Sequence, residues 1–202
     1  MSTESQPQTV SSDIPYGTVR SSADGAAHTI GFELAFPHPL ESVWAAVATP
    51  AGLRGWLAAA DPFEPGPGGA VTLRWLNRGH EGSLGGRGAE GSPEEGGAAS
   101  VAGPATPGRI TAWSRRRLAE YTVDGRGSFG FTLRGSLDDD RTRVRFRNDF
   151  TGDVESLPAA LADWHQHFEL LGEELRGRPT DWSTWTPARF AELRAEYALS
   201  LS

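Results

Sequence analysis

The chain has 202 residues, a formal net charge of −7 and no cysteine. Its length indicates one sizeable domain with extensions, because single domains usually contain about 100–200 residues. The missing cysteine excludes disulfides, thiolate nucleophiles and cysteine-ligated metal centres, and the negative charge argues against nucleic acid as a partner.

The basic residues are unusual because all 19 are arginine and lysine is absent. This excludes Schiff-base chemistry, attachment of pyridoxal phosphate and the lysine of a phosphate-binding loop. The first 16 residues are polar and lack the apolar stretch of a secretory signal. No segment reaches the roughly 18 apolar residues that a membrane span needs, so we expect a cytoplasmic protein.

Alternation of apolar with polar or small residues predicts strands along much of the chain. The first is predicted over 28–36, where Ile30, Phe32, Leu34 and Phe36 alternate with other residues. Further strands are predicted at 71–77, 108–113, 118–123, 128–137 and 142–150. The polar turn at 138–141 indicates that the last two strands form an antiparallel hairpin.

Helices are predicted on both sides of these strands. A short helix is expected over 40–48, and a second should start at Thr49, as N-cap, and Pro50 and continue to about Leu57. The strongest helix is expected to start at Ser156, as N-cap, and to end at Gly177 and Pro179. It has one apolar stripe, formed by Leu157, Leu161, Trp164, Phe168, Leu171 and Leu175. A last helix is predicted from Pro187 to about Leu199.

These elements divide the chain into one domain and its extensions. We expect a disordered tail at 1–16, the domain at 17–178 and a helical extension at 179–202. Within the domain, residues 78–106 are rich in glycine and poor in large apolar residues. Such a segment buries too little surface to offset the entropy lost on ordering, so we predict a flexible insertion.

Short motifs in a consistent order resemble a known superfamily. They are Val43-Trp44, Leu53 with Trp56-Leu57, Pro67-Gly68-Gly69, Gly108-Arg109-Ile110, Arg117-Leu118, Thr142-Arg143-Val144, the run from Asp163 to Phe168, and Leu175-Arg176-Gly177. Between residues 28 and 178 the chain thereby resembles the SRPBCC superfamily, which includes START-like, birch-pollen-allergen-like and polyketide-cyclase-like proteins. Within it, the sequence is most similar to the bacterial activator of heat-shock-protein-90 ATPase homologue group.

The resemblance implies an α+β, helix-grip fold. A curved antiparallel sheet of about six or seven strands would enclose the long C-terminal helix, with two short helices after the first strand and an extra helix at the end. Such proteins often hold an apolar molecule between the sheet and the helix. The resemblance therefore implies a small hydrophobic molecule as the partner. From the residues themselves we expect no cofactor, no metal, no nucleic acid and no insertion into a membrane, and a homodimer stays open.

The candidate ligand-binding residues are the aromatic side chains of this interior and two polar ones. They are Phe32, Trp56, Trp75, Phe131, Phe146, Asn148, Trp164, His165 and Phe168. Asn148 should point inward with its apolar neighbours, either to satisfy a backbone group or to orient a ligand. His165 should lie at the edge of the helical stripe and His167 should face solvent, so the two cannot chelate one metal ion.

Three functions are compatible with these features. The first is a non-enzymatic carrier or sensor of a hydrophobic molecule, since no catalytic motif is recognisable. The second is a cyclase or dehydratase-like enzyme, which requires His165, Asn148 or Glu120 to converge on one cavity. The third is an interaction protein that acts on a chaperone ATPase, although the eukaryotic activators carry a further domain that this chain lacks.

Overall fold

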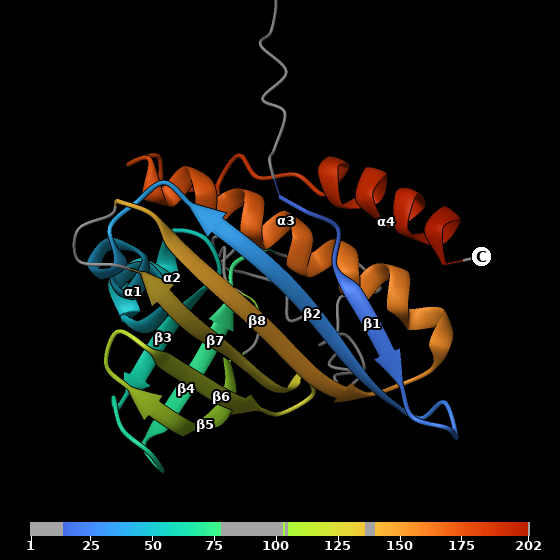
Figure 1. Ribbon diagram of the computed structural model, residues 1–202, viewed down its shortest axis with the longest axis horizontal. Coiled ribbons are helices and arrows are strands. Elements are labelled where there is room, and N and C mark those ends of the chain that lie inside the picture. The colour runs from blue at the N-terminus through green and yellow to red at the C-terminus, as the bar shows by residue number, and fades with distance from the viewer. Residues whose placement is uncertain (1–13, 78–102, 104, 136–139, 202) are drawn as a thin grey trace, which may run out of the picture.

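The computed structural model describes residues 14–77, 103, 105–135 and 140–201 (Figure 1). Within them, eight strands form one antiparallel sheet. The strands are β1 (Thr18–Ser21), β2 (Ala27–Phe36), β3 (Ala58–Phe63), β4 (Ala70–Trp75), β5 (Ala105–Ser114), β6 (Leu118–Val123), β7 (Gly127–Gly135) and β8 (Thr142–Thr151). The helices are α1 (Leu40–Ala48), α2 (Pro50–Arg54), a short 3-10 turn η1 (Val154–Ser156), α3 (Leu157–Leu175) and α4 (Ala188–Ser200).

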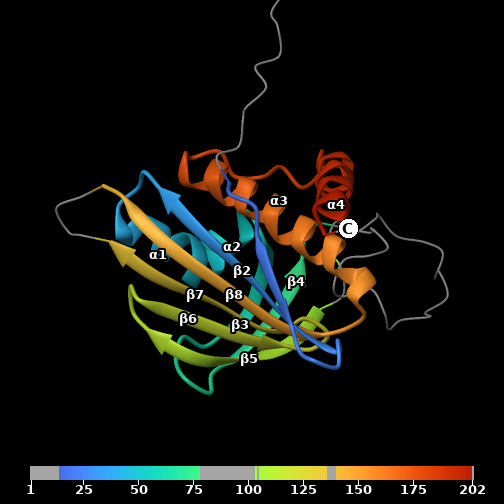
Figure 2. The same ribbon diagram turned by 45° about the vertical axis from the view of Figure 1, so that its right-hand side comes forward.

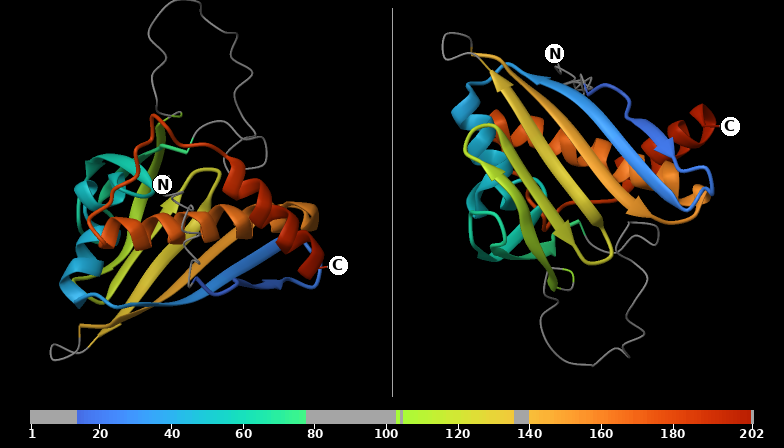
Figure 3. Two further views of the ribbon diagram at one scale, coloured as in Figure 1. Left: turned by 90° about the horizontal axis from the view of Figure 1, so that it is seen from above. Right: turned by 60° about the horizontal axis from the view of Figure 1, so that its bottom comes forward.

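The sheet curves around the long helix α3, which crosses its concave side (Figures 2 and 3). The strand order is β1-β2-β8-β7-β6-β5-β4-β3, so β1 and β3 are the two end strands. Among the described strands, β2 and β8 are the only neighbours that are not consecutive along the chain, and they pair over their full lengths. Helix α4 packs against α3. The fold is therefore α+β, as predicted.

The two faces of the sheet differ sharply in chemistry. On β8, Val144, Phe146 and Asn148 are buried while Arg145 and Arg147 are exposed. Alternate residues of a strand point to opposite faces, so the apolar set lines the concave side and the arginines cover the outer side. The predicted inward direction of Asn148 is confirmed.

Helix α3 has the boundaries and the buried stripe that its sequence predicts. Leu161, Trp164 and Phe168 are each no more than 1% exposed and contact the concave face. The expected N-cap at Thr49 is confirmed, because its hydroxyl accepts the N–H of Gly52 at 3.1 Å. The expected cap at Ser156 is wrong: its hydroxyl donates instead to the carbonyl of Asp153 at 2.6 Å.

Three predictions about the first half of the chain are corrected. Helix α2 ends at Arg54, and residues 58–63 form strand β3, because small Ala58 and Ala60 pair with Trp75 and Leu73 of β4. Strand β1 is also additional, since its short, largely exposed sequence has no apolar alternation. Over the described ranges the sheet therefore has eight strands, where about six or seven were expected.

The predicted extensions are partly outside the described residues. Of the glycine-rich insertion, 78–102 and 104 are outside them, while Ala105 and Thr106 belong to β5. Of the predicted N-terminal tail, 1–13 are outside them. Tyr16 packs on Tyr197 of α4, with 5.1 Å between the ring centroids.

Phe146 lies at the centre of the contact between sheet and helix, because its ring meets Phe131, Trp164 and Phe168 at centroid distances of 5.2, 4.4 and 5.0 Å. We expect Phe146→Ala to lower the free energy of unfolding by about 3–5 kcal/mol through lost burial and a residual cavity. Urea denaturation measures this. Val154→Ala, at a side chain that is 53% exposed, should change it by less than about 0.5 kcal/mol, and equal effects would contradict the central role of Phe146.

Candidate functional site

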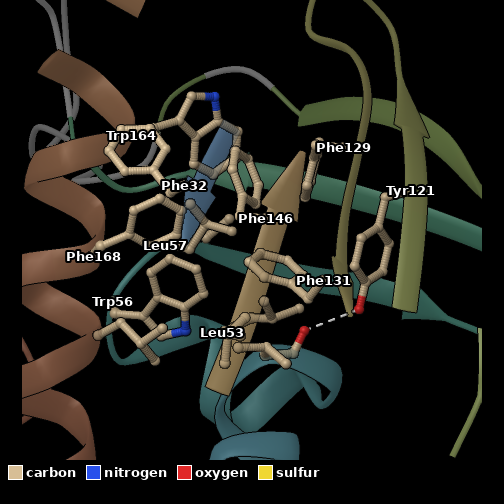
Figure 4. Packing of buried hydrophobic residues seen from close by; sticks show 14 of the residues in the cluster. Phe32, Leu53, Trp56, Leu57, Tyr121, Phe129, Phe131, Phe146, Trp164 and Phe168 are labelled. Atoms are coloured by element: carbon tan, nitrogen blue, oxygen red, sulfur yellow. Dashed lines mark hydrogen bonds between the residues drawn. The ribbon is translucent and has the colours of Figure 1, made fainter. Parts of the chain in front are cut away.

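The predicted aromatic residues form one continuous cluster between the sheet and α3 (Figure 4). Phe32, Phe131 and Phe146 project from the strands toward Trp164 and Phe168 of the helix. Trp164 and Phe168 stack with centroids 6.0 Å apart. Trp56 reaches the cluster from the segment after α2 and donates its indole N–H to the carbonyl of Ala46 at 2.9 Å. The inner surface is thus aromatic, and its rings touch one another.

Asn148 acts as a connector within this cluster. Its amide nitrogen donates to the carbonyls of Arg126 and Ser128, both at 3.0 Å, and its Oδ1 accepts the indole N–H of Trp164 at 2.9 Å. Both amide protons are therefore used inside the protein. Of the two roles expected for Asn148, the geometry supports satisfaction of backbone groups, which ties α3 to the β6–β7 turn.

Next to Asn148 lies a cluster of buried polar residues that we call the polar cluster: Asn77, Arg126, Asp163 and His167. The guanidinium Nη1 of Arg126 lies 2.5 Å from Oδ2 of Asp163, and both side chains are at most 3% exposed. Asn77 donates to Oδ1 of the same carboxylate at 3.0 Å. Arg126 also lies over the ring of Trp75, 3.9 Å from its centroid. A charge-assisted pair thus stands at one end of an otherwise apolar interior.

His167 belongs to this cluster, and the prediction that it faces solvent is wrong. It is 1% exposed, and its Nδ1 donates to the backbone carbonyl of Asp163 at 2.7 Å. Its ring also lies 6.4 Å from that of Trp56. On the helix, His167 lies about one-sixth of a turn from Trp164 in the apolar stripe. Trp56, after α2, and Asn77, after β4, cover this side of α3, so His167 is buried as well.

His165 lies on the other side of α3, away from the polar cluster. Its Nδ1 is 2.9 Å from the hydroxyl of Tyr197 on α4, and that hydroxyl also accepts the N–H of Gly17. The Tyr197 hydroxyl thus bridges the His165 ring and the backbone of Gly17. His165 therefore joins α3, α4 and the N-terminal segment.

The enzyme-like arrangement of His165, Asn148 and Glu120 is not formed. Glu120 accepts a hydrogen bond from Thr111 at 2.7 Å on the outer face, whereas Asn148 lies inside and His165 faces α4. The residues that sequence reasoning missed are Asn77, Arg126 and Asp163. The one signal in the sequence was Asp163, which lies between apolar residues on the buried side of the strongest helix. Its partners Asn77 and Arg126 come from turns far away along the chain.

Two hollows bounded by described residues lie outside the aromatic cluster. One of about 520 Å³ lies at the β1–β2 end of the sheet, and its lining includes Ser21, His28 and Phe150. Another of about 220 Å³ lies on the outer face beside Arg145 and Arg147. Among the described residues, no group of three acidic or histidine side chains is arranged to hold a metal ion. The described helices include none that is long and apolar enough to cross a membrane.

Comparison with known proteins supports the fold. No protein-family model matches the chain, and no curated protein matches its sequence. Among solved structures, the conserved protein EF2215 of unknown function from Enterococcus faecalis matches with a TM-score of 0.60 and 12% identity, over 92% of this chain and 90% of that one. CalU16 from Micromonospora echinospora matches with a TM-score of 0.56 and 15% identity, over 91% and 95%.

A third match is DynU16, a protein of the dynemicin biosynthetic locus. Its TM-score is 0.54 and its identity 16%, over 75% of this chain and 48% of that one. At such low identities the likeness shows a shared fold and carries no residue roles across.

The buried ion pair between Arg126 and Asp163 predicts a large loss of stability when its carboxylate is removed. Asp163→Ala removes the carboxylate that neutralises Arg126, so we expect a loss of about 3–5 kcal/mol in unfolding free energy. Glu33→Ala is the matched control, because it removes an ion pair between Glu33 and Arg145, whose side chains are 75% and 69% exposed. This change should lower the unfolding free energy by at most about 1 kcal/mol. Similar losses in urea denaturation would contradict a special cost at the buried pair.

The His165 contact predicts a pH dependence. Burial lowers the pKa of His165 below its ordinary 6.5, and outweighs the opposing effect of the Glu169 carboxylate. Below pH 6.5 the unfolded chain therefore binds a proton that the folded chain does not, and stability falls as pH decreases, by at most about 1.4 kcal/mol per pH unit. His165→Gln should flatten this part of the pH profile in urea denaturation. Parallel profiles for the two proteins would overturn the assignment.

Proposed function

We propose that the chain is a helix-grip protein of the SRPBCC type that binds a small hydrophobic molecule between the sheet and α3, as a non-enzymatic carrier or sensor. The observation that carries the proposal is the combination of an aromatic concave face with the polar cluster at one end. Ligand sites commonly join apolar walls to a few placed polar groups. The arrangement fits an elongated apolar molecule that has one hydrogen-bonding end.

The packing of the interior defines how such a molecule binds. Because Phe146, Trp164 and Phe168 contact one another, a ligand has to replace some of these ring contacts. Only a fraction of the molecules has the rings moved apart at any time, because that state loses the ring contacts. The observed affinity is lowered by this fraction, since only the opened molecules bind. Binding should therefore change the fluorescence of the buried tryptophans Trp56 and Trp164.

A polyketide cyclase-like enzyme is the alternative, and the likeness to DynU16 is the observation that favours it. The carrier is preferred because Glu120 and His165 lie on different sides of the molecule. An activity toward a chaperone ATPase has no support from a contact or surface among the described residues.

Native mass spectrometry of the full chain purified from its own host tests the proposal. We expect a co-purifying small molecule that, when added back, raises the melting temperature and quenches or shifts tryptophan fluorescence. A free ligand concentration of 100 times the dissociation constant should raise the free energy of unfolding by about 2.7 kcal/mol.

A pair of variants identifies where the molecule binds. Ala119 is fully buried and pairs with Phe131 on the concave side, so Ala119→Phe should fill the interior and weaken binding at least about ten-fold. Thr132→Phe lies on the exposed outer side of β7 and should leave the affinity unchanged. A ligand-free protein that also fails to bind apolar extracts of its host would refute the proposal.

A further inference from the structure

A serine and a histidine meet on the end strand β1 and its neighbour β2, where the strand ends border the hydrophobic core. Ser21 on β1 and His28 on β2 are direct partners in the antiparallel register. The hydroxyl of Ser21 lies 2.8 Å from Nδ1 of His28. Ser21 is exposed, whereas His28 is 2% exposed. A reachable hydroxyl is thus paired with a buried, ordered imidazole.

The hydrogen bonds of His28 determine which nitrogen carries the proton. Its Nε2 lies 2.9 Å from the carbonyl oxygen of Gly152. A carbonyl can only accept, so Nε2 is protonated and Nδ1 of the neutral ring is an acceptor. Nδ1 therefore receives the hydrogen bond of the Ser21 hydroxyl. The ring is also held by Phe150, with 5.5 Å between centroids. Nucleophile, base and orienting group are in the order that activated serines use.

The backbone supplies a donor beside the hydroxyl. The N–H of Ser22 donates to the carbonyl of Ala27 at 2.8 Å. Hydrogen-bonded and non-bonded pairs alternate along an antiparallel ladder, so Ser21 and His28 form a non-bonded pair and the N–H of Ser21 points away from β2. Because β1 is the end strand of the described sheet, this N–H faces the open edge. It can stabilise an oxyanion that forms on the atom attacked by Ser21.

A hollow of about 520 Å³ adjoins this pair, within the size range of small-molecule sites. It is lined by Arg20, Ser21, Ser22, Ala27, His28, Thr29, Gly127, Asp149, Phe150 and Thr151. The side chains of Ser21, His28 and Phe150 point to the concave side, whereas those of Ala27, Thr29, Asp149 and Thr151 alternate with them and point to the outer side. The hollow therefore lies at the strand ends, with residues of both faces in its lining. None of the four residues of the polar cluster lines this hollow, so chemistry at the strand ends can be tested independently of the proposed carrier function.

We propose that Ser21 and His28 form a hydrolytic site for small carboxylic esters. Oγ of Ser21 bonds to the acyl carbon while its proton passes to Nδ1 of His28. The ester C–O bond breaks, and the alcohol leaves with that proton. Water then gives a proton to Nδ1 and bonds to the acyl carbon; the Ser21 ester bond breaks and the proton returns to Oγ. One ester and one water yield one acid and one alcohol.

Diisopropyl fluorophosphate, which reacts with activated serines, tests the site in the full chain. We expect one adduct by intact mass, assigned to Ser21 by peptide mapping, and none in Ser21→Ala. The matched control is Ser183→Ala, since the exposed Ser183 hydroxyl lies outside the lining of the hollow and donates its hydrogen bond to the carboxylate of Asp181 at 2.6 Å. That variant should be labelled as fast as the natural chain. An unlabelled natural chain, or equal labelling of Ser21→Ala, would overturn the proposal.

Hydrolysis of p-nitrophenyl acetate gives an independent readout. The natural chain should exceed the uncatalysed rate, Ser21→Ala should not, and His28→Gln should be at least about 100-fold slower than the natural chain, because a positioned general base contributes that much. Thermal unfolding checks that each variant is folded. If His28→Gln does not fold, the exposed position of Ser21 means that Ser21→Ala decides the question, and a rate unchanged in Ser21→Ala would refute the proposal.

Discussion

The contact between the apolar stripe of α3 and the concave face of the sheet positions the other groups in this protein. Phe146 and Trp164 approach to 4.4 Å between ring centroids at its centre. Aromatic pairs of this kind combine large buried areas with preferred tilted geometries, so they restrict both the depth and the rotation of the helix. Once that rotation is set, Asp163 and His167 face one side of the molecule and His165 the other.

The polar cluster shows how this contact is made specific. Moving Arg126 and Asp163 out of water is costly, and their attraction offsets that cost only when the geometry and the remaining hydrogen bonds are good. Asn77 and the ring of Trp75 provide those additional contacts. A helix rotated or shifted by one residue would bury the carboxylate away from the guanidinium. The ion pair therefore selects one register of α3.

The interior and the sheet edge have different physical characters. In the interior, ring contacts are tight, and any bound molecule competes with the core that stabilises the fold. At the edge, Ser21 and His28 are held by strand register and by the carbonyl of Gly152, and substrate can approach without opening the core. The two proposed sites share no residues, so each can be altered without the other.

The sequence by itself determined most of the strands, the position of α3 and the inward direction of Asn148, because these depend on periodicity within one segment. Residues 58–63 and β1 form strands only through pairing with a neighbour, and their own patterns are weak. The tertiary structure alone decided that His167 is buried, that Arg126 reaches Asp163 and that Ser21 meets His28. Each of these depends on which distant segment covers a given side chain, and local periodicity carries no information about that.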